Sequence, residues 1–94
     1  MDLEFEWDED KRQEVIKTRK VDLLYVAQIF ENPTITKRDD REDYGEDRYI
    51  ALGHVGDEYF TLVYTPVEQG VFRLITAWKA GKNGEKRYKT RYTK

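Results

Sequence analysis

Apolar residues near the start of the chain predict a short extended segment followed by a helix. Phe5 and Trp7 alternate with a polar residue, so the segment that contains them is expected to be extended. Asp8 is a candidate N-cap, and two acidic residues follow it where the helix dipole favours negative charge. The first helix is therefore expected to run from this cap to about Arg19.

A second helix is predicted from the period of the next apolar positions. Asp22 is its candidate N-cap, and the Asn32–Pro33 pair ends it because the residue before a proline is disfavoured in the helical region. Its apolar residues lie at i, i+3, i+4 and i+7, which is typical of a helix with one buried face. They are Leu23, Val26, Ala27 and Phe30.

After residue 33 the apolar positions alternate, as they do in β-strands. Strands are expected over 34–38, 48–55, 59–65 and 71–79, with a tight turn at Gly56–Asp57. A short basic helix is expected over 83–92. The predicted fold is α+β, with two N-terminal helices, a four-stranded antiparallel meander and a short C-terminal helix.

Nine apolar residues are expected to be mostly buried in the resulting core. They are Phe5, Trp7, Leu23, Val26, Phe30, Leu52, Leu62, Leu74 and Ile75. Regular alternation along the last strand would place Trp78 on the same face as Phe72 and Leu74, and Arg73 with Lys79 on the other face.

Length and composition exclude several classes of protein. With 94 residues the chain is expected to form a single domain, 1–94, and the absence of cysteine excludes a disulfide framework and a zinc-thiolate site. No apolar run approaches the length of a membrane span, and the acidic start does not resemble a signal peptide. A cytoplasmic protein is therefore expected, with no membrane partner.

The net charge of −2 hides an asymmetry along the chain. Residues 1–47 carry 15 acidic and 8 basic residues, whereas residues 71–94 carry 8 basic residues and one acidic residue, Glu85. In the basic part, cations are interleaved with Trp78, Tyr88 and Tyr92, a combination suited to phosphates and unpaired bases. His54 is the only histidine and is expected to be an ordinary exposed residue beside the hairpin turn.

Several motifs, in order along nearly the whole chain, resemble those of the BrnT-type toxins of bacterial type II toxin–antitoxin systems. The N-terminal motif is Phe5-Glu6-Trp7-Asp8, with Lys11, Val21 and Ala27-x-x-Phe30 after it. The central and C-terminal motifs are Asp40-Arg41-x-Asp43-Tyr44-Gly45-Glu46-x-Arg48, Ala51-Leu52-Gly53, Val63-Tyr64-Thr65 and Arg73 through Ala80. The resemblance implies a RelE-like fold, translation-inhibiting ribonuclease activity and a cognate BrnA-like antitoxin.

Cleavage of RNA without a metal ion or cofactor would require a base, positive charge and a proton donor. Lys79 is the candidate base, Arg48 and Arg73 are candidates for holding the phosphate, and Tyr88 is a candidate proton donor or stacking residue. Further RNA contacts are expected from Lys82, Lys86, Arg87 and Tyr92.

The chain departs from the family pattern at a few polar positions. It has Val15, Thr18-Arg19-Lys20, Trp78 and Gly84 where the family usually has asparagine, Lys-His-Gly, arginine and glutamate. Two functions are therefore compatible with the sequence. One is a toxin that cleaves RNA, free or on the ribosome, and the other is a catalytically degenerate member that only binds antitoxin or RNA.

Overall fold

The computed structural model describes residues 3–92. Five strands and three α-helices are formed, and the second α-helix continues into a short 3₁₀ helix, η1. In chain order they are β1 (Glu4–Trp7), α1 (Glu9–Arg19), α2 (Leu23–Val26), η1 (Ala27–Glu31), β2 (Ile35–Arg38), β3 (Tyr49–Val55), β4 (Glu58–Glu68), β5 (Val71–Lys79) and α3 (Gly81–Tyr92).

The sheet contains one more strand than the sequence predicted. Its order is β1-β5-β4-β3-β2, in which β2 to β5 form the expected antiparallel meander. The extended segment at the start of the chain adds a fifth strand, β1, which pairs in parallel with β5. The α+β prediction is confirmed, and its purely antiparallel sheet is corrected to a mixed one.

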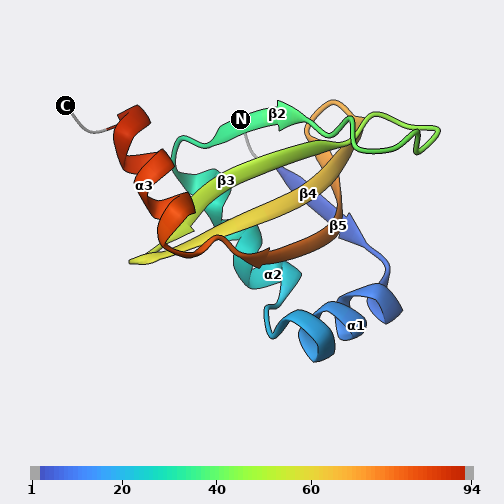
Figure 1. Cartoon of the computed structure of the whole chain (residues 1–94). Helices are drawn as coiled ribbons and strands as arrows, with labels where there is room; N and C mark the ends of the chain where they lie inside the picture. The colour runs from blue at the N-terminus through green and yellow to red at the C-terminus, as the bar shows by residue number, and fades with distance from the viewer. Residues whose placement is uncertain (1–2, 93–94) are drawn as a thin grey trace.

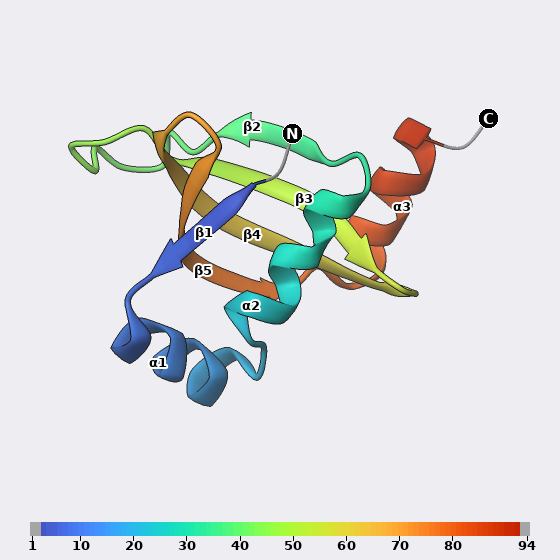
Figure 2. The ribbon, with the colours of Figure 1, turned by 180° about the vertical axis from the view of Figure 1, so that it is seen from behind.

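Helices cover the two faces of the sheet unequally. From behind, α2 and η1 cross one face, which we call the back face, and α1 lies beside the β5 edge (Figure 2). On the opposite, front face, α3 lies at one end, and the loop that joins β2 to β3 extends from the other end (Figure 1). Between α3 and this loop, the strands of the front face have no helix over them (Figure 1).

The two predicted N-caps are confirmed. The Asp8 carboxylate accepts hydrogen bonds from the backbone N–H groups of Asp10 and Lys11, and the Asp22 carboxylate accepts one from Leu24. Arg12 of α1 also donates two hydrogen bonds of 2.8 Å to the Asp22 carboxylate. One aspartate therefore begins α2 and ties it to α1.

The buried core lies between the back face and the helices. It consists of Val15, Val21, Leu23, Val26, Ala27, Ile29, Ala51, Phe60, Leu62, Tyr64, Leu74 and Ala77. Gly53 of β3 allows η1 to approach closely, because a Cβ atom there would lie 2.7 Å from the Ile29 Cβ.

Several residues expected to be mostly buried are more exposed. Trp7 is 38% exposed because it lies at the end of the edge strand β1, where its indole N–H donates to Glu9 instead of entering the core. Phe5, Phe30 and Ile75 are half-buried. The first two nevertheless pack on the core, with their rings stacked at 5.9 Å.

An irregularity in β5 changes which residues share a face of the sheet. Val63 pairs with Thr76 and Tyr64 with Leu74, so that Ile75 is an extra residue in the strand. Such a β-bulge reverses the alternation of faces beyond it. Phe72 and Leu74 face back, whereas Trp78 faces front, and the predicted common face for these three residues is therefore wrong.

The same bulge separates two cations that were expected to share a face. Arg73 is the partner of Thr65, and Lys79 is the partner of Phe60, whose side chain lies in the core behind the sheet. Because Thr65 and Phe60 lie on opposite faces of β4, Arg73 faces front and Lys79 faces back.

Within residues 3–92, no helix has the length and apolar character that a membrane span requires.

Candidate nucleic-acid interface

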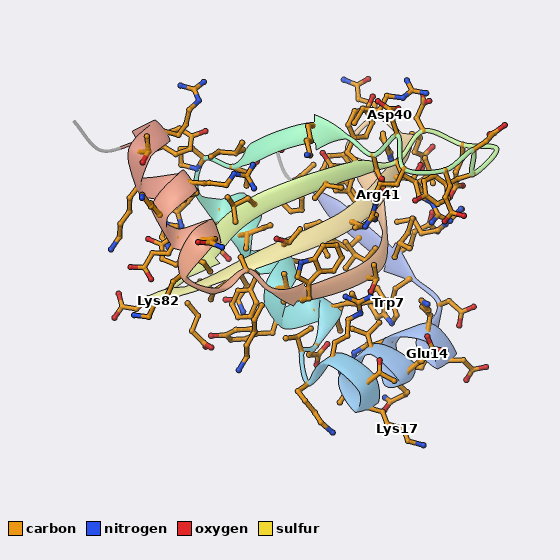
Figure 3. The ribbon with its side chains drawn as sticks, in the orientation of Figure 1. Trp7, Glu14, Lys17, Asp40, Arg41 and Lys82 are labelled. Atoms are coloured by element: carbon orange, nitrogen blue, oxygen red, sulfur yellow. The ribbon has the colours of Figure 1, made fainter. Side chains whose placement is uncertain are left out.

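The loop of residues 39–48 positions arginines at one end of the front face. Its neck is closed by a backbone hydrogen bond of 2.7 Å from the N–H of Asp39 to the carbonyl of Arg48. Arg41 projects from this loop toward the sheet, while Lys82 lies at the opposite end of the same face, at the start of α3 (Figure 3).

Asp39 organises the inside of this loop. Its side chain is fully buried and accepts two hydrogen bonds of 2.8 Å from Arg41. The Tyr44 hydroxyl donates a third hydrogen bond, of 3.2 Å, to the same carboxylate. The hydrogen bonds from Arg41 lower the pKa of Asp39 to about 2, so that the carboxylate is charged at neutral pH and holds both side chains in place.

Replacing Asp39 by asparagine should destabilise the protein in a pH-dependent way. The folded pKa of about 2 lies below the ordinary value of 3.8, so the charged carboxylate contributes stability above about pH 4 and loses it as the pH falls toward 2. At pH 7 the variant should lose about 1–3 kcal/mol of unfolding free energy. Urea unfolding at pH 7 and near pH 2 measures the difference, which should shrink in acid.

Asp40→Asn provides the matched control for this prediction. Its side chain is 75% exposed and forms an ion pair with Arg38. It should change stability by less than about 1 kcal/mol. An equal loss in the Asp39 and Asp40 variants, or a loss independent of pH, would contradict the role of the buried carboxylate.

Glu46 connects two arginines of the front face. One of its carboxylate oxygens lies 3.1 Å from Nε of Arg48, and the other lies 3.8 Å from Nη1 of Arg73. Arg48 also lies over the Tyr44 ring, with its Cζ 4.1 Å from the ring centroid. Arg73 makes a second, 3.5 Å contact with Glu6 of β1. The two guanidinium groups are therefore close enough to share one anion.

A second pair of arginines lies beside the first, around Trp78. The Cζ atoms of Arg19 and Arg41 are 4.9 and 5.8 Å from the centroid of the Trp78 ring. A surface hollow next to the β5 bulge contains Arg19, Arg41 and Arg48 together. Its remaining lining residues are Lys11, Glu14, Val15, Thr18, Glu42, Tyr44, Ile75 and Thr76.

The structure brings together only two of the four predicted catalytic residues. Arg48 and Arg73 meet at Glu46, whereas Lys79 faces back and lines a separate hollow with Lys20 and Tyr25. The proposed base and the proposed phosphate ligands therefore lie on opposite sides of the sheet. The catalytic role of Lys79 stays a prediction, and the structure does not place Lys79 beside the two arginines.

Tyr88 lies near the other end of the sheet, in an aromatic cluster under α3. It is buried, and its hydroxyl donates a 2.6 Å hydrogen bond to the carbonyl of Pro33. Burial raises its pKa. Its ring contacts those of Tyr59 and His54, and the histidine is half-buried at the end of β3 rather than exposed as expected. In this position Tyr88 fixes α3 to the sheet.

The predicted RNA-binding residues all lie on α3. Lys82, Lys86 and Arg87 are exposed along the helix, and Tyr92 is 42% exposed with its hydroxyl donated to the carbonyl of Thr34. They form a basic ridge at the end of the front face opposite Arg41 (Figure 3).

Gly84, one of the departures from the family pattern, is buried on the inner side of α3. A Cβ atom there would lie 2.4 Å from the Ala80 Cβ and 3.3 Å from Cδ1 of Leu52. A larger residue would push the helix away from β3.

Neither Arg19 nor Arg41 was predicted from the sequence as a site residue. Arg41 belongs to a motif that resembles the BrnT-type toxins, but the six acidic residues around it are more typical of a solvated acidic loop. Arg19 lies at the end of a helix that faces the site only because α1 packs beside the exposed edge of β5. In the part of the chain that the structure describes, no three histidine or acidic side chains come together as metal ligands would.

The chain was compared with known families and structures. The profile of a family described as the ribonuclease toxin BrnT of type II toxin–antitoxin systems matches residues 7–88. The fold is similar to the 1.1 Å crystal structure of the Brucella abortus ribonuclease toxin BrnT, with a TM-score of 0.62 and 23% sequence identity over 85% of this chain and 99% of that one. None of the curated sequences compared with the chain matches it.

Proposed function

Because the chain belongs to the BrnT family of ribonuclease toxins of type II toxin–antitoxin systems, we propose that it inhibits translation by cleaving RNA without a metal ion. We further propose that a cognate antitoxin neutralises it by covering the front face. The observation that carries the proposal is the pair of arginines, Arg48 and Arg73, held around one carboxylate on this open face.

The arginine pair is suited to a phosphodiester. Guanidinium groups bind phosphate oxygens as they bind carboxylate oxygens, through charged hydrogen bonds. In the resting protein the Glu46 carboxylate occupies the position between Arg48 and Arg73. A phosphate of the RNA would replace it there, and the two positive charges would stabilise the additional negative charge of the pentacoordinate transition state.

Cleavage would use the ribose 2′-hydroxyl as the nucleophile. The 2′-oxygen attacks the adjacent phosphorus and the bond to the 5′-oxygen breaks. The leaving 5′-oxygen takes a proton from water, and the products are a 2′,3′-cyclic phosphate and a 5′-hydroxyl. Glu46 is the carboxylate that contacts both arginines, and we assign it as the acceptor of the 2′-hydroxyl proton. Its displacement by the phosphate leaves it next to the reacting groups.

The remaining RNA would follow the front face toward α3. The strands between the 39–48 loop and α3 have no helix over them, and the ridge at the far end offers Lys82, Lys86 and Arg87 to further phosphates (Figure 1). The exposed part of Tyr92 is available for stacking on a base. An antitoxin that blocks this path should present acidic residues to the same cations, and its association should weaken with salt.

One observation favours the second candidate function, a member that binds RNA or antitoxin without cleaving. Lys79 and Tyr88, the base and acid predicted from the sequence, do not meet the arginine pair. Without a base at the phosphate, the front face would only bind RNA or antitoxin. Glu46 distinguishes the two functions, since only the cleaving protein needs it.

Replacing Glu46 by glutamine should separate binding from cleavage. Removing the competing carboxylate should strengthen the binding of single-stranded RNA by about two- to fivefold, because exposed ion pairs are worth less than about 1 kcal/mol each. Single-turnover cleavage should nevertheless slow by about 10²- to 10⁴-fold, the loss expected for a general base. Filter binding and quenched-time cleavage of the same oligonucleotide measure the two effects.

Glu42→Gln is the matched control for this variant. Glu42 is an exposed acid of the same loop, and among residues 3–92 it makes none of the ion pairs that Glu46 makes. Its replacement should leave the cleavage rate unchanged. Unchanged cleavage in the Glu46 variant, with tighter binding, would show that the carboxylate is only a competitor of the phosphate.

Induced expression in a bacterial host tests the proposed function as a whole. We expect growth arrest with loss of RNA, relieved by co-expression of the cognate antitoxin. Normal growth in cells that contain the folded protein would instead support the non-cleaving member.

A further inference from the structure

Arg19 differs from the other cations of the hollow in the group that its side chain contacts. Lys11 lies 3.0 Å from Glu14, Arg41 2.8 Å from Asp39, and Arg48 3.1 Å from Glu46. Arg19, by contrast, forms no ion pair within residues 3–92. Its guanidinium lies over the Trp78 ring instead, with Cζ 4.9 Å from the centroid.

An aromatic ring and a carboxylate affect an arginine differently. Stacking on the face of an indole fixes the position of the guanidinium through its attraction to the ring electrons, but it does not neutralise the charge or use all of the N–H donors. A carboxylate both fixes the position of the guanidinium and neutralises its charge. Arg19 is therefore held in place with donors that remain available to an incoming anion.

The place at which Arg19 is held lies next to the proposed cleavage site. It comes from the last turn of α1, beside the bulged edge of β5, and lines the same hollow as Arg48. The bulge turns Trp78 to the front face, and without it the ring would face the core behind the sheet and could not hold Arg19 there.

We propose that Arg19 is an additional phosphate-binding residue, that Trp78 is the residue that positions it, and that the hollow holds a second phosphate of the RNA next to the one between Arg48 and Arg73. This inference rests on the proposed function, because it takes single-stranded RNA as the ligand. It extends the contact with RNA from the arginine pair to α1, along β5 in the direction of Trp78.

The test is the salt dependence of binding of a single-stranded RNA oligonucleotide. Arg19→Gln should weaken binding by about fivefold at low salt. It should also reduce the slope of log affinity against log salt by about 0.7, the value for one phosphate contact on a single strand. Lys17→Gln is the matched control, since Lys17 lies on the same helix and points away from the sheet (Figure 3). It should leave the slope unchanged.

The role of Trp78 is tested by a double-mutant cycle. Trp78→Leu should reproduce the loss of slope, because Arg19 then has no ring to lie on, and Trp78→Phe should restore most of it. In the Arg19→Gln background Trp78→Leu should have little further effect, since both changes remove the same interaction. Circular dichroism shows whether each variant is folded. If the Trp78→Leu variant does not fold, the cycle is measured with Trp78→Phe in its place.

Three outcomes would overturn the inference. One is an unchanged slope for Arg19→Gln, and another is a full additional loss from Trp78→Leu in the double variant, which would mean that the ring contacts RNA itself. The third is equal losses for the Lys17 and Arg19 variants. Arg48→Ala measured in parallel distinguishes these from failure of the proposed function, because that variant must also weaken binding if RNA uses the front face.

Discussion

Replacing Arg48 by alanine should lower the single-turnover rate of RNA cleavage by about 10²- to 10³-fold, the loss typical of removing one group that stabilises developing charge. Arg48 is the better placed of the two arginines because it is half-buried, stacked on Tyr44 and closer to the shared carboxylate. Binding of RNA should weaken much less than the rate. Arg73→Ala should show a smaller loss of rate, since its guanidinium is more exposed and is shared with Glu6.

Arg38→Ala is the control for the arginine variants. Arg38 belongs to the same loop neck and forms ion pairs with Asp40 and Asp47, but it does not reach the Glu46 carboxylate. The Arg38→Ala protein should cleave RNA at close to the rate of the parent protein. If the Arg38 and Arg48 variants lose the same activity, the loss reflects general charge and not the arginine pair.

Replacing Phe60 by alanine should cost about 3–5 kcal/mol of unfolding free energy, the usual range for a large buried ring. Phe60 is 2% exposed, belongs to the core, and meets the Tyr25 ring in a T-shaped contact with the ring centroids 5.9 Å apart. A small domain is stable by only about 5–15 kcal/mol, so this loss would unfold a large fraction of the protein at elevated temperature. Thermal and urea unfolding measure it.

Val67→Ala is the control for the core variant. Val67 lies in the same strand but is 39% exposed. It should change the unfolding free energy by less than about 0.5 kcal/mol. An unchanged melting temperature for the Phe60 variant would contradict the assignment of the core to the back face.

The sequence predicted the local structure well because the first two helices begin at aspartates with an evident capping role. Asp8 and Asp22 cap their helices as expected, and β2 to β5 follow the alternation of apolar residues. The extended segment at the start of the chain was predicted, but its parallel pairing with β5 was not, because β5 begins more than sixty residues later and four alternating residues do not reveal such a pairing. The family resemblance, carried by motifs along the chain, is confirmed.

The candidate site was harder to predict because it depends on a one-residue irregularity. Leu74 and Ile75 are both apolar, so the sequence does not show which of them faces the core. The extra residue in β5 nevertheless moves Trp78 to the front face and Lys79 to the back. The two departures from the family pattern at Arg19 and Trp78 meet in space, which the linear sequence could not show.

Cleavage of a labelled RNA by the purified protein in the presence of a metal chelator is the decisive measurement for metal-independent cleavage at the arginine pair. The substrate is compared with versions that carry a 2′-deoxyribose at the cleaved position, and the new ends are identified. We expect cleavage in the chelator, a 2′,3′-cyclic phosphate on the product, no reaction at the deoxyribose, and a loss of at least about 10²-fold in the Arg48→Ala protein. Cleavage that requires added metal, proceeds past the deoxyribose or is unchanged in the Arg48 variant would contradict this mechanism.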